Sequence, residues 1–284
     1  MTGTATAGAA NSITLAAGAS ATDNIYRNLI LRITAGQGAG TVAIVTGYVG
    51  STRVATLRPL TGTVTPNNTS AYSIGLQTFY TPVSSAFSSA TIYYNIDGVL
   101  HRLTGCRGTF QLNAAVGEIP RIDFTMQGIY NPPTDTAQPT AQYADQATPQ
   151  VFRQDNSGGF NLSGFGSCLQ SISLDIGNSL IYRELVNCTK EVILNDRAVS
   201  GNAVLEAPTI AQRDYFTTAL QDGNLGDLSF IHGTAAGNVV SAITSRADIG
   251  SPNYEDSNGV HMLNIPVTLI PSTAGNDELR LVFA

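Results

Sequence analysis

PRIDFTMQGIYNPPTD, residues 120–135, decides the fold class because its first half alternates apolar and polar side chains, the period of a β-strand. The apolar face is formed by Ile122, Phe124 and Met126. The opposite face is small, hydrophilic and faintly acidic, and it is formed by Asp123, Thr125 and Gln127. We expect the strand to end after Tyr130, because Pro132 and Pro133 follow and proline cannot donate to a β-ladder.

A second stretch, SISLDIGNSLIYREL (171–185), repeats this chemistry. Its apolar face contains Ile172, Leu174 and Ile176, and its polar face contains Ser171, Ser173 and Asp175. An antiparallel sheet with one face in water explains the alternation. It explains less well the near absence of lysine, which often protects exposed sheet edges. A sheet that joins copies of itself around a closed ring has no free edge, and its polar face would line a central hole.

The stretch 131–166 between these strands has no periodicity, and it contains four prolines and the pair Gly158-Gly159. We predict that it is one long loop. Loops of this length inside a compact domain are uncommon and are usually functional or disordered.

Most of the remaining chain is predicted to form short strands. Alternating runs and glycine turns over residues 12–76 indicate a small β-barrel or sandwich, which we assign to a domain spanning 1–78. Residues 79–284 form a second domain with one amphipathic helix, which begins at the Thr209–Gln212 capping box and ends near Gly223. The predicted fold class is mainly β: a sandwich or barrel with one flanking α-helix, plus a small N-terminal all-β domain.

Composition and charge exclude several functions. Only 12% of the residues are charged, about half the usual share, and a surface of hydroxyls and amides suits chains that pack against copies of themselves. The net charge is −6 without a cluster of Lys or Arg, so tight binding of nucleic acid is not expected. The same charge suits a surface that lets DNA slide past. The N-terminus lacks the pattern of a signal peptide, and no segment is long and apolar enough for a membrane span.

No motif for catalysis or ligand binding stands out. The three histidines, His101, His232 and His261, lie far apart and outside any recognised nucleophile motif. The glycine-rich AGQGAG (35–40) is followed by a strand instead of the helix that a dinucleotide site requires. Three cysteines give no complete disulfide framework and no zinc spacing. We therefore expect no enzymatic activity, no cofactor and no metal site.

Three segments together resemble one known family: GEIPRIDFTMQGIYNPPTD (117–135), SISLDIGNSLIYREL (171–185) and NDRAVSGNAVLEAPTIAQRDYF (195–216). They are similar to the tail tube, or major tail, proteins of long-tailed bacteriophages, and the likeness covers roughly residues 80–284. The resemblance implies a β-sandwich with a flanking helix. It also implies a ring of six copies whose inner sheets join into one barrel, with rings stacked head to tail and the long loop reaching the adjoining ring.

The resemblance assigns roles to particular residues. It implies that the polar faces line the channel, with Asp123, Thr125, Gln127, Ser171, Ser173 and Asp175 as lumen candidates. It implies that the long loop makes the contact between rings, with Tyr130, Asn131, Pro132, Pro133, Tyr143 and Phe152 as candidates. The N-terminal module departs from minimal family members, and it could decorate the tube, help stacking or bind a cell surface.

The partners implied by the resemblance are further copies of this chain and the tail terminator, tape measure and distal tail proteins. Double-stranded DNA would be a transient cargo without sequence-specific binding, and no membrane partner is expected. The chain would reside in the virion tail, after assembly in the host cytoplasm. Two alternative functions remain. The first is a carbohydrate-binding adhesin or tail-fibre module, which the absence of Trp disfavours. The second is a secretion-system tube protein, which would leave residues 12–76 unexplained.

Overall fold

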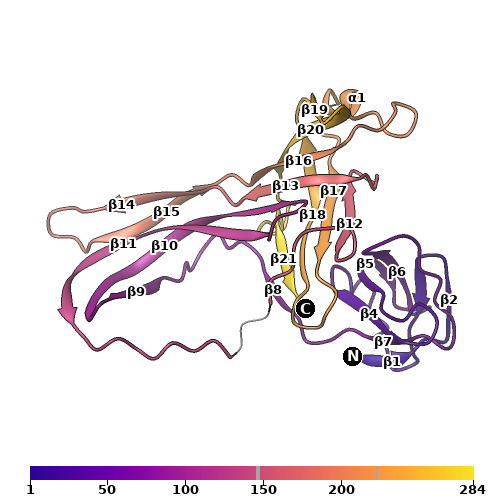
Figure 1. The fold of residues 1–284 in the computed structure, drawn as a ribbon, viewed down its shortest axis with the longest axis horizontal. Coiled ribbons are helices and arrows are strands. Elements are labelled where there is room, and N and C mark those ends of the chain that lie inside the picture. The colour runs from indigo at the N-terminus through magenta and orange to yellow at the C-terminus, as the bar shows by residue number, and fades with distance from the viewer. Residues whose placement is uncertain (145–147, 222) are drawn as a thin grey trace.

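The structure is a computed structural model that describes residues 1–144, 148–221 and 223–284. Within these residues the chain is almost entirely β, with a seven-stranded sheet, a twelve-stranded sheet, a two-stranded hairpin and one short helix. Figure 1 shows the small N-terminal sheet on one side of the body and long strands that extend as arms on the other side. The mainly β prediction is therefore confirmed.

The N-terminal sheet curls around its own core. Its strands are β1 (Thr2–Thr4), β2 (Ala7–Ala9), β3 (Ser12–Thr14), β4 (Ile30–Ala35), β5 (Val42–Val49), β6 (Val54–Pro59) and β7 (Ala71–Ser73). They are ordered β1-β7-β4-β5-β6-β3-β2. The two outermost strands, β1 and β2, are consecutive in the chain, so the sheet bends until its ends lie close together.

Strands β4 and β5 are apolar on both faces because each face meets a different core. Leu31 and Val45 point into the curled sheet with Tyr72. Ile30 and Ile44 point the other way and pack against the large sheet, in a cluster that includes Ile231. This second cluster fixes the N-terminal sheet to the rest of the chain, since apolar burial is the main force that holds packed layers together.

Polar contacts and one glycine complete this junction. The Arg58 guanidinium lies 2.9 Å from the Asp227 carboxylate and donates to Ser229 Oγ at 2.8 Å. The Gly159 N–H donates to the Leu60 carbonyl at 2.8 Å. A Cβ on Gly158 would lie 1.8 Å from the same carbonyl oxygen, so only glycine allows this close approach.

The large sheet folds over to make a sandwich. Its strands are β8 (Thr78–Tyr80), β9 (Ala90–Ile96), β10 (Val99–Ala115), β11 (Arg121–Asp135), β12 (Ser157–Leu162), β13 (Leu169–Asp175), β16 (Ser200–Glu206), β17 (Gly226–His232), β18 (Val240–Ile249), β19 (Asn253–Ser257), β20 (Val260–Leu269) and β21 (Arg280–Phe283). The main order is β11-β10-β13-β16-β20-β18-β17-β12, with β9 beside β10, β19 beside β20, and β21 between β18 and β8.

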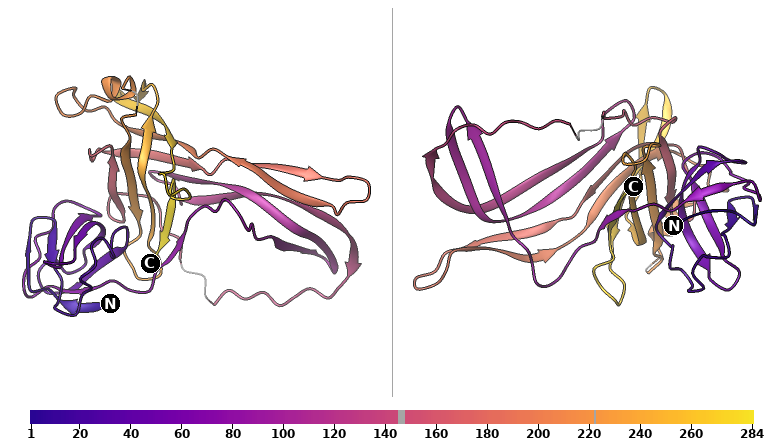
Figure 2. Two further views of the ribbon diagram at one scale, coloured as in Figure 1. Left: turned by 180° about the vertical axis from the view of Figure 1, so that it is seen from behind. Right: turned by 90° about the horizontal axis from the view of Figure 1, so that it is seen from below.

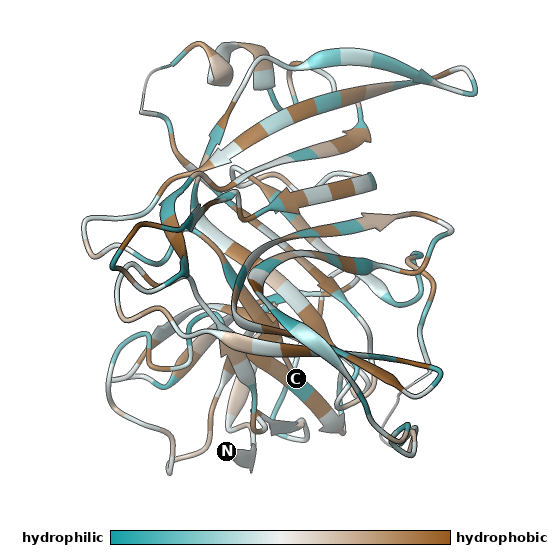
Figure 3. Cartoon of the chain, turned by 90° about the vertical axis from the view of Figure 1, so that its left-hand side faces the viewer, coloured by the Kyte–Doolittle hydropathy of each residue, from teal (hydrophilic) through white to brown (hydrophobic). Residues whose placement is uncertain are grey.

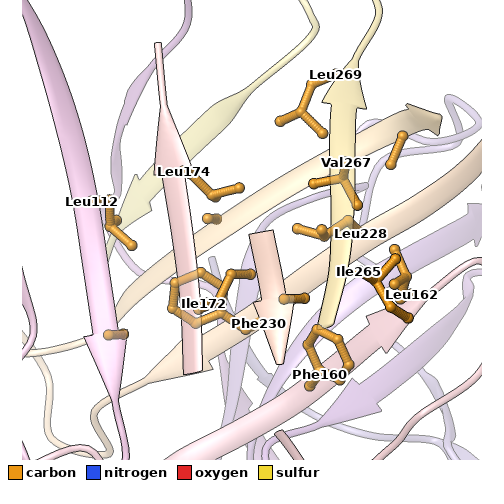
Figure 4. Close-up of a cluster of buried hydrophobic side chains, with 14 of the residues drawn as sticks. Leu112, Phe160, Leu162, Ile172, Leu174, Leu228, Phe230, Ile265, Val267 and Leu269 are labelled. Carbon is orange, nitrogen blue, oxygen red and sulfur yellow. The ribbon is translucent and has the colours of Figure 1, made fainter. Parts of the chain in front are cut away.

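The core lies where these two parts of the sheet face each other. Figure 1 shows β10, β13 and β16 crossing steeply over β17, β18 and β21, the orthogonal type of sheet packing. Figure 4 shows Leu112, Ile172 and Leu174 from the first part near Leu228 and Phe230 from the second. Alternating apolar and polar bands along the strands, visible in Figure 3, reflect this one-sided burial.

Two arms leave the sandwich on the same side. One is formed by β9 and the outer parts of β10 and β11, and β10 alone has 17 residues, which span about 55 Å at strand geometry. The other is the hairpin of β14 (Asn178–Arg183) and β15 (Glu191–Arg197), which continue β13 and β16 outward. Figure 2 shows the arms from behind and from below: the hairpin contacts β10 and β11, and the tips of the two arms diverge.

The structure corrects the predicted long loop at both ends. Strand β11 does not stop at Tyr130 but continues to Asp135, with Pro132 and Pro133 opposite a register shift on β10. Residues 157–162 form β12 at the edge of the sheet. The irregular part of 131–166 is therefore shorter than predicted, and residues 145–147 of it lie outside the described residues.

The predicted helix is also shorter and starts later. Gln212 Oε1 accepts hydrogen bonds from the backbone N–H and hydroxyl of Thr209, both at 3.0 Å, but these close only a turn. Helix α1 (Tyr215–Ala219) begins after Asp214, whose extended backbone interrupts the helical path and whose carboxylate caps Thr217 N at 2.9 Å. Gly223 lies beyond the helix end, which is capped at Leu220.

Candidate functional site

The six residues predicted to form a polar face lie on one face of the large sheet. Asp123, Thr125 and Gln127 come from β11, and Ser171, Ser173 and Asp175 come from β13. Strand β10 lies between them: Gln111 is opposite both Asp123 and Asp175, and residues directly opposite each other in a sheet share a face. The structure therefore joins two distant sequence segments into one continuous surface.

Strand β10 contributes polar residues that the sequence interpretation missed. Thr109 is opposite Thr125, and Asn113 is opposite Ser173. The signal was present in RGTFQLNAAV (107–116), in which polar and apolar residues also alternate. On the next strand, Asn202 of β16 continues the face beside Ser173.

Hydrogen bonds hold the two carboxylates of this face as acceptors. Asn113 Nδ2 donates to Asp123 Oδ2 at 3.2 Å. Asp175 Oδ1 accepts from the Gly177 N–H at 2.7 Å, in the bend where β13 passes into β14. The face thus presents two carboxylates among hydroxyls and amides, and the register adds Arg121 opposite Asn113 and Arg107 opposite Gln127.

Two strands of the arms have an edge without a partner strand. Among the described residues β11 pairs only with β10, which leaves an edge of 15 residues unpaired. Strand β15 pairs only with β14, so its outer edge is also free. Phe124 on β11 is 66% exposed, and Tyr93, Tyr94, Ile181 and Tyr182 on the arms are exposed as well. Long free edges with exposed apolar side chains mark a surface that binds another chain.

The candidates for contact between rings divide into two groups. Tyr130 and Tyr143 are 68% and 70% exposed. Asn131 is partly buried, and its side-chain amide donates to Thr104 Oγ1 at 3.0 Å within the arm. Phe152 differs from the expectation, because it is 4% exposed and packs in the core with its ring 5.8 Å from His232. Phe152 anchors the returning end of the loop and offers no surface for another ring.

Phe152 lies beside a buried polar cluster, formed by Asn156, Ser157 and His232, that the sequence did not indicate. Ser157 Oγ and His232 Nδ1 lie 2.8 Å apart, and Ser157 also donates to Asn156 Oδ1 at 3.0 Å. Burial lowers the pKa of His232, and a hydrogen bond with the Gln150 backbone opposes that shift. Both Ser157 and His232 are buried, and no carboxylate in the described residues bonds the imidazole, so the pair lacks the third member and the access of a catalytic triad.

The described residues hold no group of three or more His, Cys, Asp and Glu side chains arranged for a metal. Cys106 is buried, and Cys168 and Cys188 are exposed free thiols. No helix within the described ranges has the length and apolar character needed to cross a membrane.

The sequence of this chain matches the model of one known protein family. Residues 1–269 match the phage tail tube protein family. The chain belongs to this family. It is a structural protein of the phage tail and not an enzyme, and a tail tube protein resides in the tail of the virion. No curated protein matches the chain.

The family match covers more of the tail tube protein than the sequence resemblance did. The resemblance was drawn over roughly residues 80–284, whereas the match begins at residue 1 and includes the whole N-terminal sheet. The N-terminal sheet is thus part of what this chain shares with that family.

Proposed function

We propose that six copies of this tail tube protein close into a ring, that rings stack into a tube, and that the tube conducts double-stranded DNA. The observation that carries this proposal is a sheet with a polar face that ends in the unpaired edge of β11, together with the separate β14–β15 hairpin, whose strand β15 has an unpaired edge. A sheet of this kind closes into a barrel only by joining copies of itself.

Ring closure would join β11 of one copy to β15 of the next. Strand β11 runs from the body toward the arm tip, and β15 runs from the tip back to the body, so neighbours related by rotation would pair them antiparallel (Figure 1). The exposed apolar side chains of the arms, Phe124 among them, would be buried between copies. Such burial makes an obligate interface.

The polar face would line the channel. Asp123, Thr125, Gln127, Ser171, Ser173 and Asp175 would face the bore, with Gln111 and Asn113 between them. Six copies of a chain with net charge −6 give a ring with a formal charge of about −36. Such a lining would not hold phosphate tightly, because it has no cluster of cations: Arg121 and Arg107 lie apart, opposite Asn113 and Gln127, so DNA would slide through.

Stacking would use the extended chain that follows β11. Tyr130, Asn131, Pro132 and Pro133 lie in the outer part of β11, Tyr143 lies in the chain that follows Asp135, and the two tyrosines are exposed. Exposed tyrosines on an otherwise polar segment supply contact area at low entropic cost. Phe152 would serve this contact indirectly, because it ties the returning chain to the core.

At the two ends of the tube, where no further ring of this protein follows, the same surfaces would meet other tail components. By resemblance to the family, these are the tail terminator, the tape measure protein inside the bore and the distal tail protein. The proposal includes no cofactor and no membrane contact.

Electron microscopy of the purified full chain tests the proposal. Negative-stain images are expected to show six-fold rings or tubes with a central channel. Monomers at all concentrations, or a chain that binds glycans without assembling, would contradict the ring and favour an adhesin. Rings of another symmetry would contradict the hexamer.

A further inference from the structure

A cavity beside the free edge of β15 is lined by a buried carboxylate, Glu278, one oxygen of which has no hydrogen-bond partner. It has a volume of about 540 Å³ and is bordered by β15, by the end of β20 and by Glu278. Strand β16 pairs with β20 as far as Ser200 opposite Thr268, and β20 then ends at Leu269. Ser84 and Phe87 also border the cavity, which therefore lies beside the body end of β15.

Glu278 has one oxygen that finds no partner in the described chain. Its side chain is 3% exposed, and Oε1 accepts from Arg197 Nε at 2.6 Å. Oε2 is buried and has no hydrogen bond. A buried carboxylate oxygen without a donor is unfavourable, so a donor from outside the chain would be bound with a net gain.

The neighbouring charges do not satisfy this oxygen. Arg197 uses its other nitrogens on the Val83 carbonyl at 2.7 Å and on Asn276 Oδ1 at 3.2 Å. Asp196, which also lines the cavity, adds a second carboxylate on the exposed side. The cavity therefore has two carboxylates and one fully engaged guanidinium, and it suits a cationic donor.

Strand β11 carries one cation, and it lies at the matching end. Arg121 is the first residue of β11 and is exposed. Within the described residues it makes no hydrogen bond through its side chain and no ion pair with a carboxylate. If β11 of one copy pairs antiparallel with β15 of the next, the body end of β11, Arg121, meets the body end of β15, Asp196 and Arg197.

We infer that the Arg121 guanidinium of one copy enters the Glu278 cavity of the adjacent copy and donates to Glu278 Oε2 and to Asp196. This inference rests on the proposed ring and names the residues that fix its register. Arginine fits because its planar fork can donate to two carboxylate oxygens at once. The interaction sets which strand edges meet, since a slip of one residue would leave the buried oxygen without a donor.

The variant Arg121→Gln tests the contact between copies without disturbing the fold of the single chain. The variant should keep the far-UV spectrum and thermal unfolding of the isolated chain, because Arg121 has no side-chain partner within it. Loss of one member of a desolvated charge pair should raise the protein concentration needed for half-maximal ring assembly by roughly tenfold or more. Arg102→Gln is the control, since it removes an exposed arginine from β10 of the same arm, and it should assemble like the parent chain.

A disulfide between copies tests the position directly. In a background of Cys168→Ser and Cys188→Ser, Arg121→Cys with Asp196→Cys should give, on oxidation, a ladder of covalent oligomers up to the hexamer. Thr91→Cys with Asp196→Cys is the matched pair for the rival edge strand β9, and it should stay monomeric on a denaturing gel.

The outcomes separate this inference from the proposed function. If the parent chain forms rings but Arg121→Gln assembles at the same concentration, or if only the Thr91 pair cross-links, the Arg121–Glu278 contact is wrong and the ring stands. If the parent chain forms no rings under any condition, both the proposed ring and the Arg121–Glu278 contact are wrong. Ring weakening by Arg121→Gln together with the Arg121–Asp196 ladder supports the contact.

Discussion

Asp123 and Asp175 stand opposite the same residue, Gln111, on the two strands that flank β10. The two carboxylates are therefore two strand spacings apart, about 10 Å, on one face of one sheet. At this distance in water they repel each other only weakly, so the sheet tolerates both as charged groups. Repeated around a ring, the pair would form a band of negative charge along the bore.

Reversal of these two charges should change how tubes treat DNA without changing assembly. Tubes of Asp123→Lys with Asp175→Lys should retain short duplex DNA at low ionic strength and release it as salt rises, because the lining becomes cationic. Co-sedimentation measures this. Asp155→Lys with Asp256→Lys makes the same change in net charge elsewhere and should leave DNA unbound. Equal DNA retention by both variants, or loss of assembly in the first, would contradict the lumen assignment.

The two ends of the irregular segment should respond differently to truncation. Phe152→Ala should lower the free energy of unfolding by about 3–5 kcal/mol, because a buried aromatic ring is replaced by a void between Phe230 and His232. Tyr143→Ala should change it by no more than about 0.5 kcal/mol, because the side chain is exposed. Urea unfolding checks both. A large cost for Tyr143→Ala would mean that this tyrosine packs within its own chain.

Gly158→Ala should weaken the junction between the N-terminal sheet and the large sheet. The added methyl group would overlap the Leu60 carbonyl oxygen, and relief of the clash should cost about 1–3 kcal/mol of unfolding free energy. Gly47→Ala is the matched control, because a Cβ there meets nothing within 4 Å. Equal urea midpoints for the two variants would show that the junction is looser than the contacts indicate.

Acid should destabilise the chain through His232 before it affects the carboxylates. Burial lowers the pKa of His232. Below about pH 6.5 the imidazole therefore binds a proton in the unfolded state while it stays neutral in the folded state. Stability should fall as pH drops from 7 toward the lowered pKa and then level off. Asp214 and Asp277, whose pKa values are lowered by hydrogen bonds from Thr217 and Ser272, lose their contribution only below about pH 4.

His232→Asn should remove this slope, because an amide can still bond Ser157 but does not titrate in this range. Urea midpoints at pH 7.5 and 5.5 give the comparison. His101→Asn should keep the slope of the parent chain, since its side chain is exposed on the arm. A slope that survives His232→Asn would assign the acid sensitivity to another group.

The alternation of side chains predicted the buried face of the body correctly. Ile172 and Leu174 are buried while Ser171 and Ser173 on the same strand are only partly covered, as a period of two requires. The same reasoning predicted apolar and polar faces on β11, yet Phe124 on its apolar face is exposed. Periodicity shows that two faces differ, and it does not show what covers the apolar one.

Local rules failed where the tertiary structure offered an alternative. Pro132 and Pro133 did not end β11, because its outer edge is unpaired and a register shift on β10 removes the need for their missing N–H groups. Gly158 and Gly159 indicated a loop, but they form part of β12. The absence of a Cβ at Gly158 allows the Leu60 carbonyl oxygen to approach its backbone closely. The Ser157–His232 contact joins residues 75 positions apart and leaves no pattern in the sequence.

An electron cryomicroscopy reconstruction of assembled tubes tests the central claim most directly, by locating the side chains of Asp123 and Asp175. We predict that both point into the central channel in every subunit, beside a continuous sheet that crosses from β15 of one copy to β11 of the next. Carboxylates on the outer wall or inside a subunit interface would contradict the account.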